Sequence, residues 1–336
     1  MRAFTAPLEN LEEYSQIRER LKKNQGILQV SGCIESQKSH FMYCLGEEYH
    51  QKLILTYSDL RAREIYENYR FFDRNVLIYP ARDLMFYSAD IQSHQIGMQR
   101  MMVLKALMEQ EDVTIIATLP ACMEKILPLE YIREHVLEFG SDSTVDLQKL
   151  SVSLTEMGYE KVAQVESVGQ FAIRGGIVDL YPLTEENPVR MELWGDEIDS
   201  IRSFDILSQR SIENLNAVRI YPANEVLVSE AQAEAAMKKI EKEGQKQEEY
   251  FRTTMHTEEA FHVKTLTGEI REKLIDLKER SGLDNLVPYF YKKLVSFIDY
   301  LDEDALLCLD EPNRISQEGA AVEQEFAQSM ESRLDK

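Results

Sequence analysis

Short apolar segments alternate with helical stretches in the first part of the chain, and this alternation limits the fold more than any other feature. The apolar segments cover 27–30, 52–57, 75–79 and 112–117, and helical patterns cover 8–24, 58–70 and 96–109. Strands that are apolar on both faces and are joined by helices are typical of a parallel sheet with helices on both sides. The sequence therefore predicts a doubly wound α/β domain over residues 1–135, in which Ser58 is a helix N-cap.

The composition changes after residue 135. Strand patterns cover 176–181, 189–194 and 197–204, a helical pattern covers 146–157, and Gly, Pro and Asn lie between them. Connections of this kind are typical of hairpins. We therefore expect an inserted small α+β domain over 136–222.

The last part of the chain, 223–336, is predicted to be a helix-rich domain. Its Glu/Lys-rich helical pattern runs to about residue 280, and an apolar strand at 304–310 is expected to return to the first sheet. Residues 320–336 form a polar helical pattern with no closing cap, as expected of a segment of a longer protein.

The net charge argues against DNA binding by this chain alone. The formal charge is −21 and the isoelectric point is near 4.8, whereas duplex binding depends largely on Lys and Arg that neutralise phosphates. Acidic surfaces usually confer solubility, and the binding of a protein partner is the alternative. No signal-peptide pattern and no membrane-length apolar run occur, so we expect a cytoplasmic protein without a membrane partner. The 4 cysteines and 6 histidines are scattered, which predicts no metal site.

A near match to a phosphate-binding loop lies at 32–39, with the sequence GCIESQKS. Gly32, Lys38 and Ser39 fit the pattern G-x-x-x-x-G-K-[ST]. Gln37 replaces the second glycine, whose lack of a Cβ lets the backbone wrap phosphates. Glu35 also places a carboxylate where the backbone N–H groups should meet an anion. We expect a nucleotide site that no longer binds ATP, and hence no cofactor; a chance match is the alternative.

An acidic pair, Asp310 and Glu311, follows the last apolar strand. A Walker B pair occupies such a position in nucleotide-hydrolysing proteins. Taken alone, an ordinary turn is the more frequent explanation of these two residues. Together with the altered loop, they indicate a degenerate ATPase in which neither carboxylate has a catalytic role.

The central domain carries the most specific pattern. Residues 171–182 read FAIRGGIVDLYP, residues 187–202 read NPVRMELWGDEIDSIR, and Phe204-Asp205 follows. This joint pattern closely resembles the UvrB-homology region of the bacterial transcription-repair coupling factors, the Mfd family. The sequence SQRS at 208–211 resembles Mfd more than UvrB. The resemblance covers essentially the whole chain and implies a degenerate RecA-like, UvrB-like domain 1A (1–135), domain 2 (136–222) and domain 1B (223–336).

The resemblance implies a function in transcription-coupled nucleotide excision repair. Full-length members of the family are ATP-dependent DNA translocases that act on stalled RNA polymerase and bring in UvrA. Their motor and their polymerase-binding module lie outside this chain. The segment is therefore expected to be a non-enzymatic module that binds UvrA, with RNA polymerase and DNA as partners of the full-length protein. A C-terminal module is expected to mask the UvrA-binding surface.

Two other functions remain open. One is a UvrB-like ATPase that verifies DNA damage, which requires an intact phosphate loop and an aromatic β-hairpin. Only a short connector with Phe86 and Tyr87 joins Tyr79 to the helix near Ile96, so we expect no such hairpin. The other is an autoinhibitory scaffold for the missing motor, a function that can coexist with UvrA binding.

Strand alternation at 189–194 places Arg190, Glu192 and Trp194 on one face. Composition alone favours a solvated face on which Trp194 covers an apolar patch. The resemblance instead implies that Arg174, Arg190 and Trp194 contact UvrA, with Trp194 in place of the family's usual phenylalanine.

The neighbouring residues are expected to orient these side chains. Arg174 precedes Gly175-Gly176, a pair that permits a bulge. Asp196 and Glu197 are expected to hold the arginines in place, with a plain turn role as the alternative for Asp196.

Overall fold

The computed structural model describes residues 2–23, 26–82, 90–275 and 286–334, and the chain divides into two compact units. The first unit contains 1–81, 106–124 and 297–327. The second contains 82–105, 125–296 and 328–336. Each unit has its own sheet and its own hydrophobic core.

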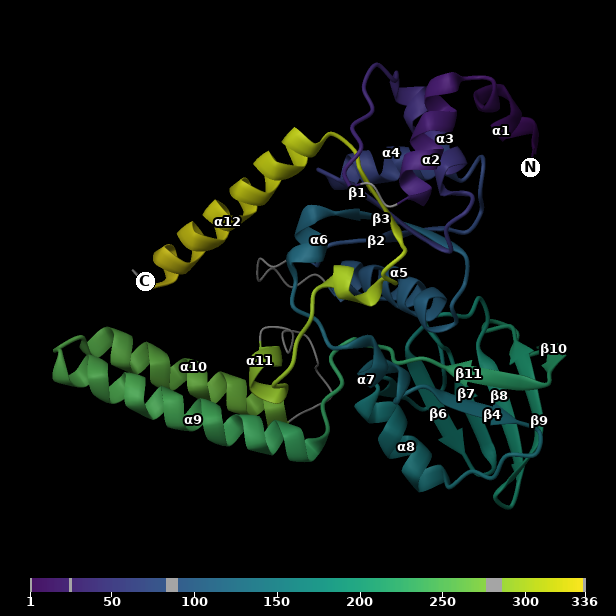
Figure 1. The fold of residues 1–336 in the computed structure, drawn as a ribbon. Helices are drawn as coiled ribbons and strands as arrows, with labels where there is room; N and C mark the ends of the chain where they lie inside the picture. Colours follow the sequence, from purple (N-terminus) through teal and green to yellow (C-terminus); the bar gives the residue numbers. More distant parts are fainter. Residues whose placement is uncertain (1, 24–25, 83–89, 276–285, 335–336) are drawn as a thin grey trace. The chain divides into compact units, whose positions relative to one another are not determined.

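A four-stranded parallel sheet forms the centre of the first unit (Figure 1), in the order β12–β1–β3–β2. Its strands are β1 (Gln51–Thr56), β2 (Val76–Tyr79), β3 (Val113–Thr118) and β12 (Leu306–Leu309). Every residue of β1 and β3 is buried, as expected of central strands covered on both faces. The prediction of a mixed α/β fold with a parallel sheet is confirmed, and the apolar segment predicted near 304–310 does return to this sheet.

The first unit also contains helices from the N-terminal, central and C-terminal parts of the chain. They are α1 (Arg2–Glu9), α2 (Glu12–Lys22), α3 (Glu35–Gly46), α4 (Asp59–Tyr69), α6 (Leu119–Met123), the 3₁₀ helix η2 (Phe297–Tyr300) and the first part of α12 (Pro312–Leu334). Ser58 caps α4 as predicted, because its hydroxyl accepts a hydrogen bond from the Arg61 N–H at 3.3 Å. The buried tyrosines of α2, α3 and α4 share one core cluster with Ile54 and Ile116 of the sheet.

The strand predicted at 27–30 is wrong. Residues 27–30 have no regular structure, and Ile27 is 96% exposed. A four-residue apolar run becomes a buried strand only when a sheet edge pairs with it, and none of the described strands does so. The single helix predicted over 8–24 is also wrong. The segment belongs to two helices, α1 and α2, which are separated near Asn10.

The second unit contains a six-stranded sheet in the order β10–β9–β8–β7–β6–β5 and a two-stranded sheet, β11–β4. The strands are β4 (Leu137–Gly140), β5 (Glu160–Lys161), β6 (Gln170–Arg174), β7 (Ile177–Leu180), β8 (Val189–Trp194), β9 (Glu197–Phe204), β10 (Ser211–Leu215) and β11 (Ala217–Ile220). All neighbours in the larger sheet are antiparallel except β5 and β6. The predicted strands 189–194 and 197–204 are confirmed.

Helix α8 (Leu147–Glu156) covers one face of the larger sheet. Asp146 caps it by accepting hydrogen bonds from the N–H groups of Gln148 and Lys149. Leu150 and Leu154 share one core cluster with Val178 and Met191. One face of the sheet is therefore apolar and covered, and its other face is available for polar side chains.

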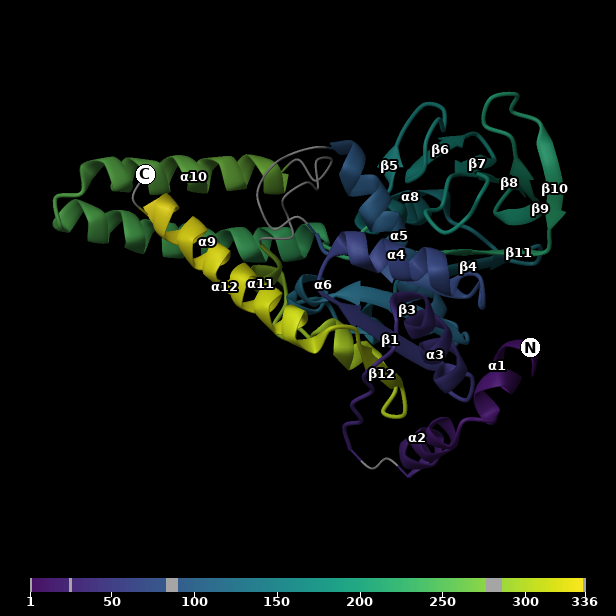
Figure 2. The ribbon, with the colours of Figure 1, turned by 90° about the horizontal axis from the view of Figure 1, so that it is seen from above.

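The other helices of the second unit are α5 (Asp90–Met108), α7 (Leu129–Arg133), α9 (Glu230–Thr253), α10 (Thr257–Ile275) and α11 (Val287–Phe290). The last residues of α5, from 106 on, belong to the first unit. Helices α9 and α10 form an antiparallel hairpin (Figures 1 and 2). Ser229 and Gln232 form a capping box at the start of α9. Gly244 allows the close approach of the two helices, since a Cβ there would lie 2.6 Å from Thr267 Oγ1.

A buried ion pair joins α5 to the segment that leads into α9. Arg100 donates to both carboxylate oxygens of Glu225, at 2.5 and 3.1 Å, and Arg82 lies 3.0 Å from the same carboxylate. Burial alone would raise the pKa of Glu225, but the positive charges of Arg100 and Arg82 outweigh burial and lower it to about 2. Glu225 is thus held as a carboxylate inside the second unit.

Candidate functional site

Arg174 and Arg190 share one buried carboxylate, that of Asp179. Arg190 donates to it through Nε at 2.6 Å and Nη2 at 3.0 Å, and Arg174 donates through Nη2 at 2.5 Å. Asp179 is 1% exposed, whereas about half of the Arg174 side chain is exposed. Asp179 lies opposite Arg190 in the β7–β8 ladder, so the two side chains project from the same face of the sheet.

The Arg190 guanidinium is fixed from several sides. It lies over the Phe204 ring, 4.6 Å from the ring centre, and its Nη2 also donates to Gln209 Oε1 at 3.0 Å. Its hydrogen bond with Asp179 is the main cause that raises the pKa of Arg190, so its charge is permanent. Val189 and Met191, the strand neighbours of Arg190, lie in the core. The predicted alternation along 189–191 is therefore confirmed.

Trp194, at the end of β8, is 84% exposed. The β8–β9 register shifts between Glu192 and Leu193, and Gly195 takes φ +68° in the hairpin turn that follows. A tryptophan this exposed does not lie over an apolar patch of its own unit. Its side chain instead faces solvent.

The sequence-based assignment of Asp196 and Glu197 as holders of the arginines is wrong. Asp196 lies in the hairpin turn, where its carbonyl accepts from the Val145 N–H at 2.7 Å, and Glu197 lies opposite Trp194 in the ladder. Asp179 holds the two arginines instead, because it projects from the strand next to Arg190. The motif GIVDLYP contains Asp179, and a single aspartate within this apolar strand was the sequence feature that could have predicted its role.

The Gly175-Gly176 pair forms a hairpin turn and not a bulge. It connects β6 to β7, and Gly175 has φ +60°. At Gly176 a Cβ would lie 2.8 Å from the Leu193 carbonyl oxygen. The two glycines thus close the turn beside Arg174, which is the last residue of β6.

The altered phosphate loop lies in the first unit. Helix α3 begins at Glu35, so Gln37 falls in its first turn. Gln37 Oε1 accepts a hydrogen bond from the Ile34 N–H at 3.2 Å, which places a side chain over one of the N–H groups at the helix start. Ser39, expected at the end of the loop, is buried.

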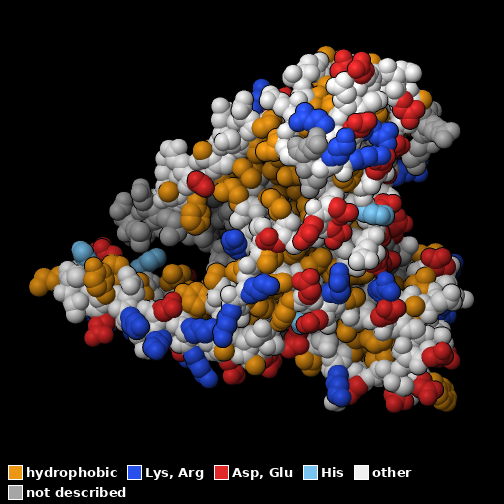
Figure 3. Space-filling model, viewed as in Figure 1, with side chains coloured by type: hydrophobic (Ala, Val, Ile, Leu, Met, Phe, Trp, Pro, Cys, Tyr) orange, Lys and Arg blue, Asp and Glu red, His pale blue; other side chains and the backbone are white. Residues whose placement is uncertain are grey.

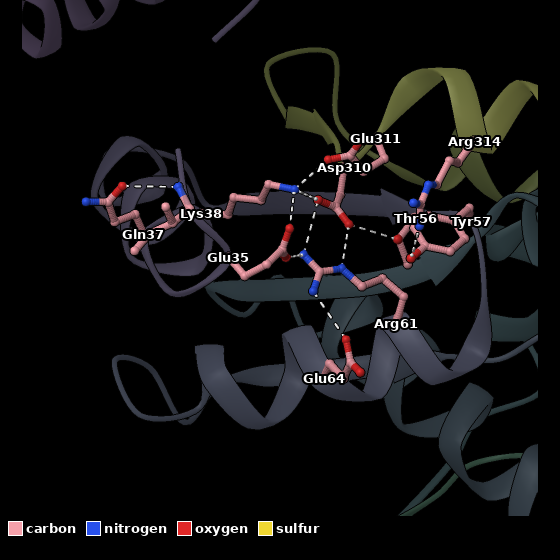
Figure 4. A network of polar contacts seen from close by, with 11 residues as sticks. Glu35, Gln37, Lys38, Thr56, Tyr57, Arg61, Glu64, Asp310, Glu311 and Arg314 are labelled. Atoms are coloured by element: carbon pink, nitrogen blue, oxygen red, sulfur yellow. Dashed lines mark hydrogen bonds and ion pairs between the residues drawn. The ribbon is translucent and has the colours of Figure 1, made fainter. Parts of the chain in front are cut away.

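Carboxylates surround Lys38 (Figure 4). Its Nζ lies 2.6 Å from Glu311, 2.9 Å from Glu35 and 3.4 Å from Asp310. Burial alone would lower the pKa of Lys38, but hydrogen bonds to Glu311 and Glu35 outweigh burial and raise it. The cation that a phosphate would need is thus already paired.

Arg61 of α4 completes the network. Its Nε donates to Asp310 at 2.8 Å, and its guanidinium also pairs with Glu35 and Glu64. Thr56 donates to the same carboxylate oxygen, Asp310 Oδ2, at 3.1 Å. Burial would raise the pKa of Asp310, but the Arg61 hydrogen bond outweighs burial and lowers it. The predicted acidic pair and the predicted loop lysine therefore meet, and they neutralise each other.

Basic side chains are not spread evenly over the second unit. Figure 3 shows Lys and Arg gathered along α9, where Lys238, Lys242 and Lys246 are exposed.

In the part of the chain that the structure describes, no group of three or more His, Cys, Asp or Glu could hold a metal ion. Within the same residues, no helix is both long and apolar enough to cross a membrane.

Comparison with known proteins places these features in a family. Residues 137–226 match the UvrB interaction domain. The transcription-repair-coupling factor of Bacillus subtilis strain 168 is 31% identical over 320 residues, which are 91% of this chain and 26% of that protein. The UvrABC system protein B of Thermosipho africanus is 30% identical over 323 residues, 89% of this chain and 48% of that protein.

The chain contains a UvrB interaction domain and is homologous to the N-terminal region of transcription-repair-coupling factors. A transcription-repair-coupling factor of Staphylococcus epidermidis is also similar, with 30% identity over 252 residues that cover 73% of the chain. This UvrB-homology chain spans about a quarter of the length of the Bacillus subtilis factor. Its relatives have a role in DNA repair, and both Arg174 and Arg190 lie inside the matched interaction domain.

Proposed function

We propose that this chain recruits UvrA to lesions where RNA polymerase has stalled, as the UvrA-binding part of a transcription-repair coupling factor. The observation that carries the proposal is the shared carboxylate of Asp179, which holds Arg174 and Arg190, with the exposed Trp194 at the end of the strand that carries Arg190. Arginine and tryptophan dominate the residues whose loss weakens protein interfaces. Guanidinium groups fixed before binding also lose less entropy when a partner docks.

The nucleotide site of this chain is proposed to be a relic. A phosphate at Lys38 would have to displace the carboxylates of Glu35 and Glu311. It would also meet the side chain of Gln37 where the phosphate-loop pattern has glycine. These features support a module without ATPase activity over a UvrB-like enzyme.

The rest of the coupling activity is proposed to lie outside this chain. In the full-length protein we expect an ATP-dependent translocase motor, with RNA polymerase and DNA as partners. We also expect a C-terminal module to cover the surface around Arg190 until the protein is activated. Covering an exposed tryptophan and a half-exposed arginine would keep them from binding UvrA prematurely.

The proposal is tested by calorimetric titration of purified UvrA into this chain, with and without ATP. We expect saturable binding that does not depend on nucleotide bound to this chain. A folded chain that gives no binding heat and retains no UvrA in a pull-down would refute the proposal.

A further inference from the structure

We infer that Arg202 is a third arginine of the UvrA-binding surface, and that this surface receives a carboxylate-bearing segment of UvrA. The inference rests on the proposed function and extends its site. Arg202 lies on β9, directly opposite Arg190 in the β8–β9 ladder. Since Asp179 lies opposite Arg190 on the other side, the three side chains form one row on the face away from α8.

Arginines are concentrated on this face. Arg174, Arg190 and Arg202 lie there with the carboxylates of Asp179 and Glu192, and Glu197 and Glu160 project from the same face opposite Trp194 and Gln170. Asp179 and Glu192 are already engaged: Asp179 with Arg174 and Arg190, and Glu192 with Arg202. In a chain of net charge −21, three arginines grouped on one face are a distinct feature.

The Arg202 side chain is partly accessible. Its Nη2 pairs with Glu192, and 28% of the side chain is exposed. A guanidinium has five N–H donors, of which the buried Nε is out of a partner's reach. A second carboxylate approaching this face would therefore meet the outer N–H groups of the guanidinium.

The arrangement has the character of a binding surface and not of a stabilising one. Like charges directly opposite each other in a ladder are destabilising, and Arg190 and Arg202 are such a pair. A purely structural face would gain by replacing one of them. Two planar forks side by side suit a carboxylate, which accepts paired hydrogen bonds from arginine.

The test compares UvrA binding and thermal unfolding for four chains by surface plasmon resonance and circular dichroism. They are the parent, Arg190→Ala, Arg202→Ala and Arg219→Ala. Arg219 is the matched control, because it is a half-exposed arginine on another sheet, paired with Glu138 at 3.1 Å. Arg202→Gln repeats the test with most of the side-chain stem retained.

We expect Arg202→Ala and Arg202→Gln to weaken UvrA binding about tenfold or more, with a melting temperature equal to or above that of the parent. Arg219→Ala should bind as the parent does. Binding by both Arg202 variants within about twofold of the parent, while Arg190→Ala is weakened, overturns this inference alone. If both variants melt at lower temperature and lose as much free energy of unfolding as they lose free energy of binding, Arg202 has a structural role, and this result also overturns the inference. A folded parent that does not bind UvrA overturns the proposed function itself.

Discussion

Arg190 and Asp179 face each other across the β7–β8 ladder, joined by two hydrogen bonds of 2.6 and 3.0 Å. Because the same carboxylate also holds Arg174 at 2.5 Å, one buried residue orients both arginines of the proposed surface.

Replacing this carboxylate should damage both stability and binding. We expect Asp179→Asn to lower the free energy of unfolding by about 1–3 kcal/mol, below the usual cost of breaking a buried pair because the arginines are partly exposed. Urea unfolding measures the change, and Asp199→Asn, an exposed aspartate on β9, is the control. Equal stability of the two variants would show that Asp179 does not hold the arginines.

ATP should not bind to this chain. Lys38 is paired with Glu35 and Glu311, and Gln37 stands where the phosphate loop needs glycine. Isothermal titration with Mg-ATP should give no saturable heat. Micromolar affinity would contradict the relic site and favour the UvrB-like enzyme.

Duplex DNA, damaged or intact, should not be retained at physiological salt. The net charge of −21 opposes the approach of phosphates. The exposed lysines of α9 are too few to reverse this, and any contact they make at low salt should vanish as salt rises. A gel shift at low-micromolar protein that persists at moderate salt, and that Lys242→Glu/Lys246→Glu abolishes, would reveal a basic binding surface on α9.

Acid should destabilise the chain partly through Glu225. Its pKa of about 2 in the folded protein lies below the ordinary 4.5, so its stabilising effect is complete above pH 4.5 and is lost as the pH falls toward 2. A shift of this size corresponds to on the order of 3 kcal/mol. Glu225→Gln should therefore unfold more easily at neutral pH and lose less stability between pH 5 and 2 than the parent. Parallel pH profiles of the two chains in urea unfolding would contradict this assignment.

Much of the sheet architecture could be predicted from periodicity. The segments at 52–57 and 112–117 are apolar on both faces and became the buried strands β1 and β3. The segment at 27–30 looks similar but is exposed, because pairing with a sheet edge is a tertiary property that four residues do not encode. The aromatic-hairpin prediction depends on the connector with Phe86 and Tyr87, which lies outside the described residues. The domain boundaries at 135 and 222 remain predictions.

The candidate site was only partly predictable for a related reason. Alternation placed Val189 and Met191 in the core and Arg190 on the other face, since both follow from a period of two. The carboxylate that holds the arginines depends on which strand lies beside β8 and in which register. Asp196 and Glu197 are near Trp194 in sequence, whereas Asp179 is near Arg190 in space.

The central claim is tested most directly by surface plasmon resonance of UvrA on the Arg174→Ala/Arg190→Ala double variant, with circular dichroism melts to confirm folding. Each single arginine variant should lose about 2–5 kcal/mol of binding free energy, roughly thirty-fold or more in affinity. Trp194→Ala should lose less, and Arg→Lys should recover only part, because a point charge cannot replace the planar fork. We predict that the folded double variant has no measurable UvrA binding. A folded double variant that binds UvrA as tightly as the parent would contradict the proposed surface.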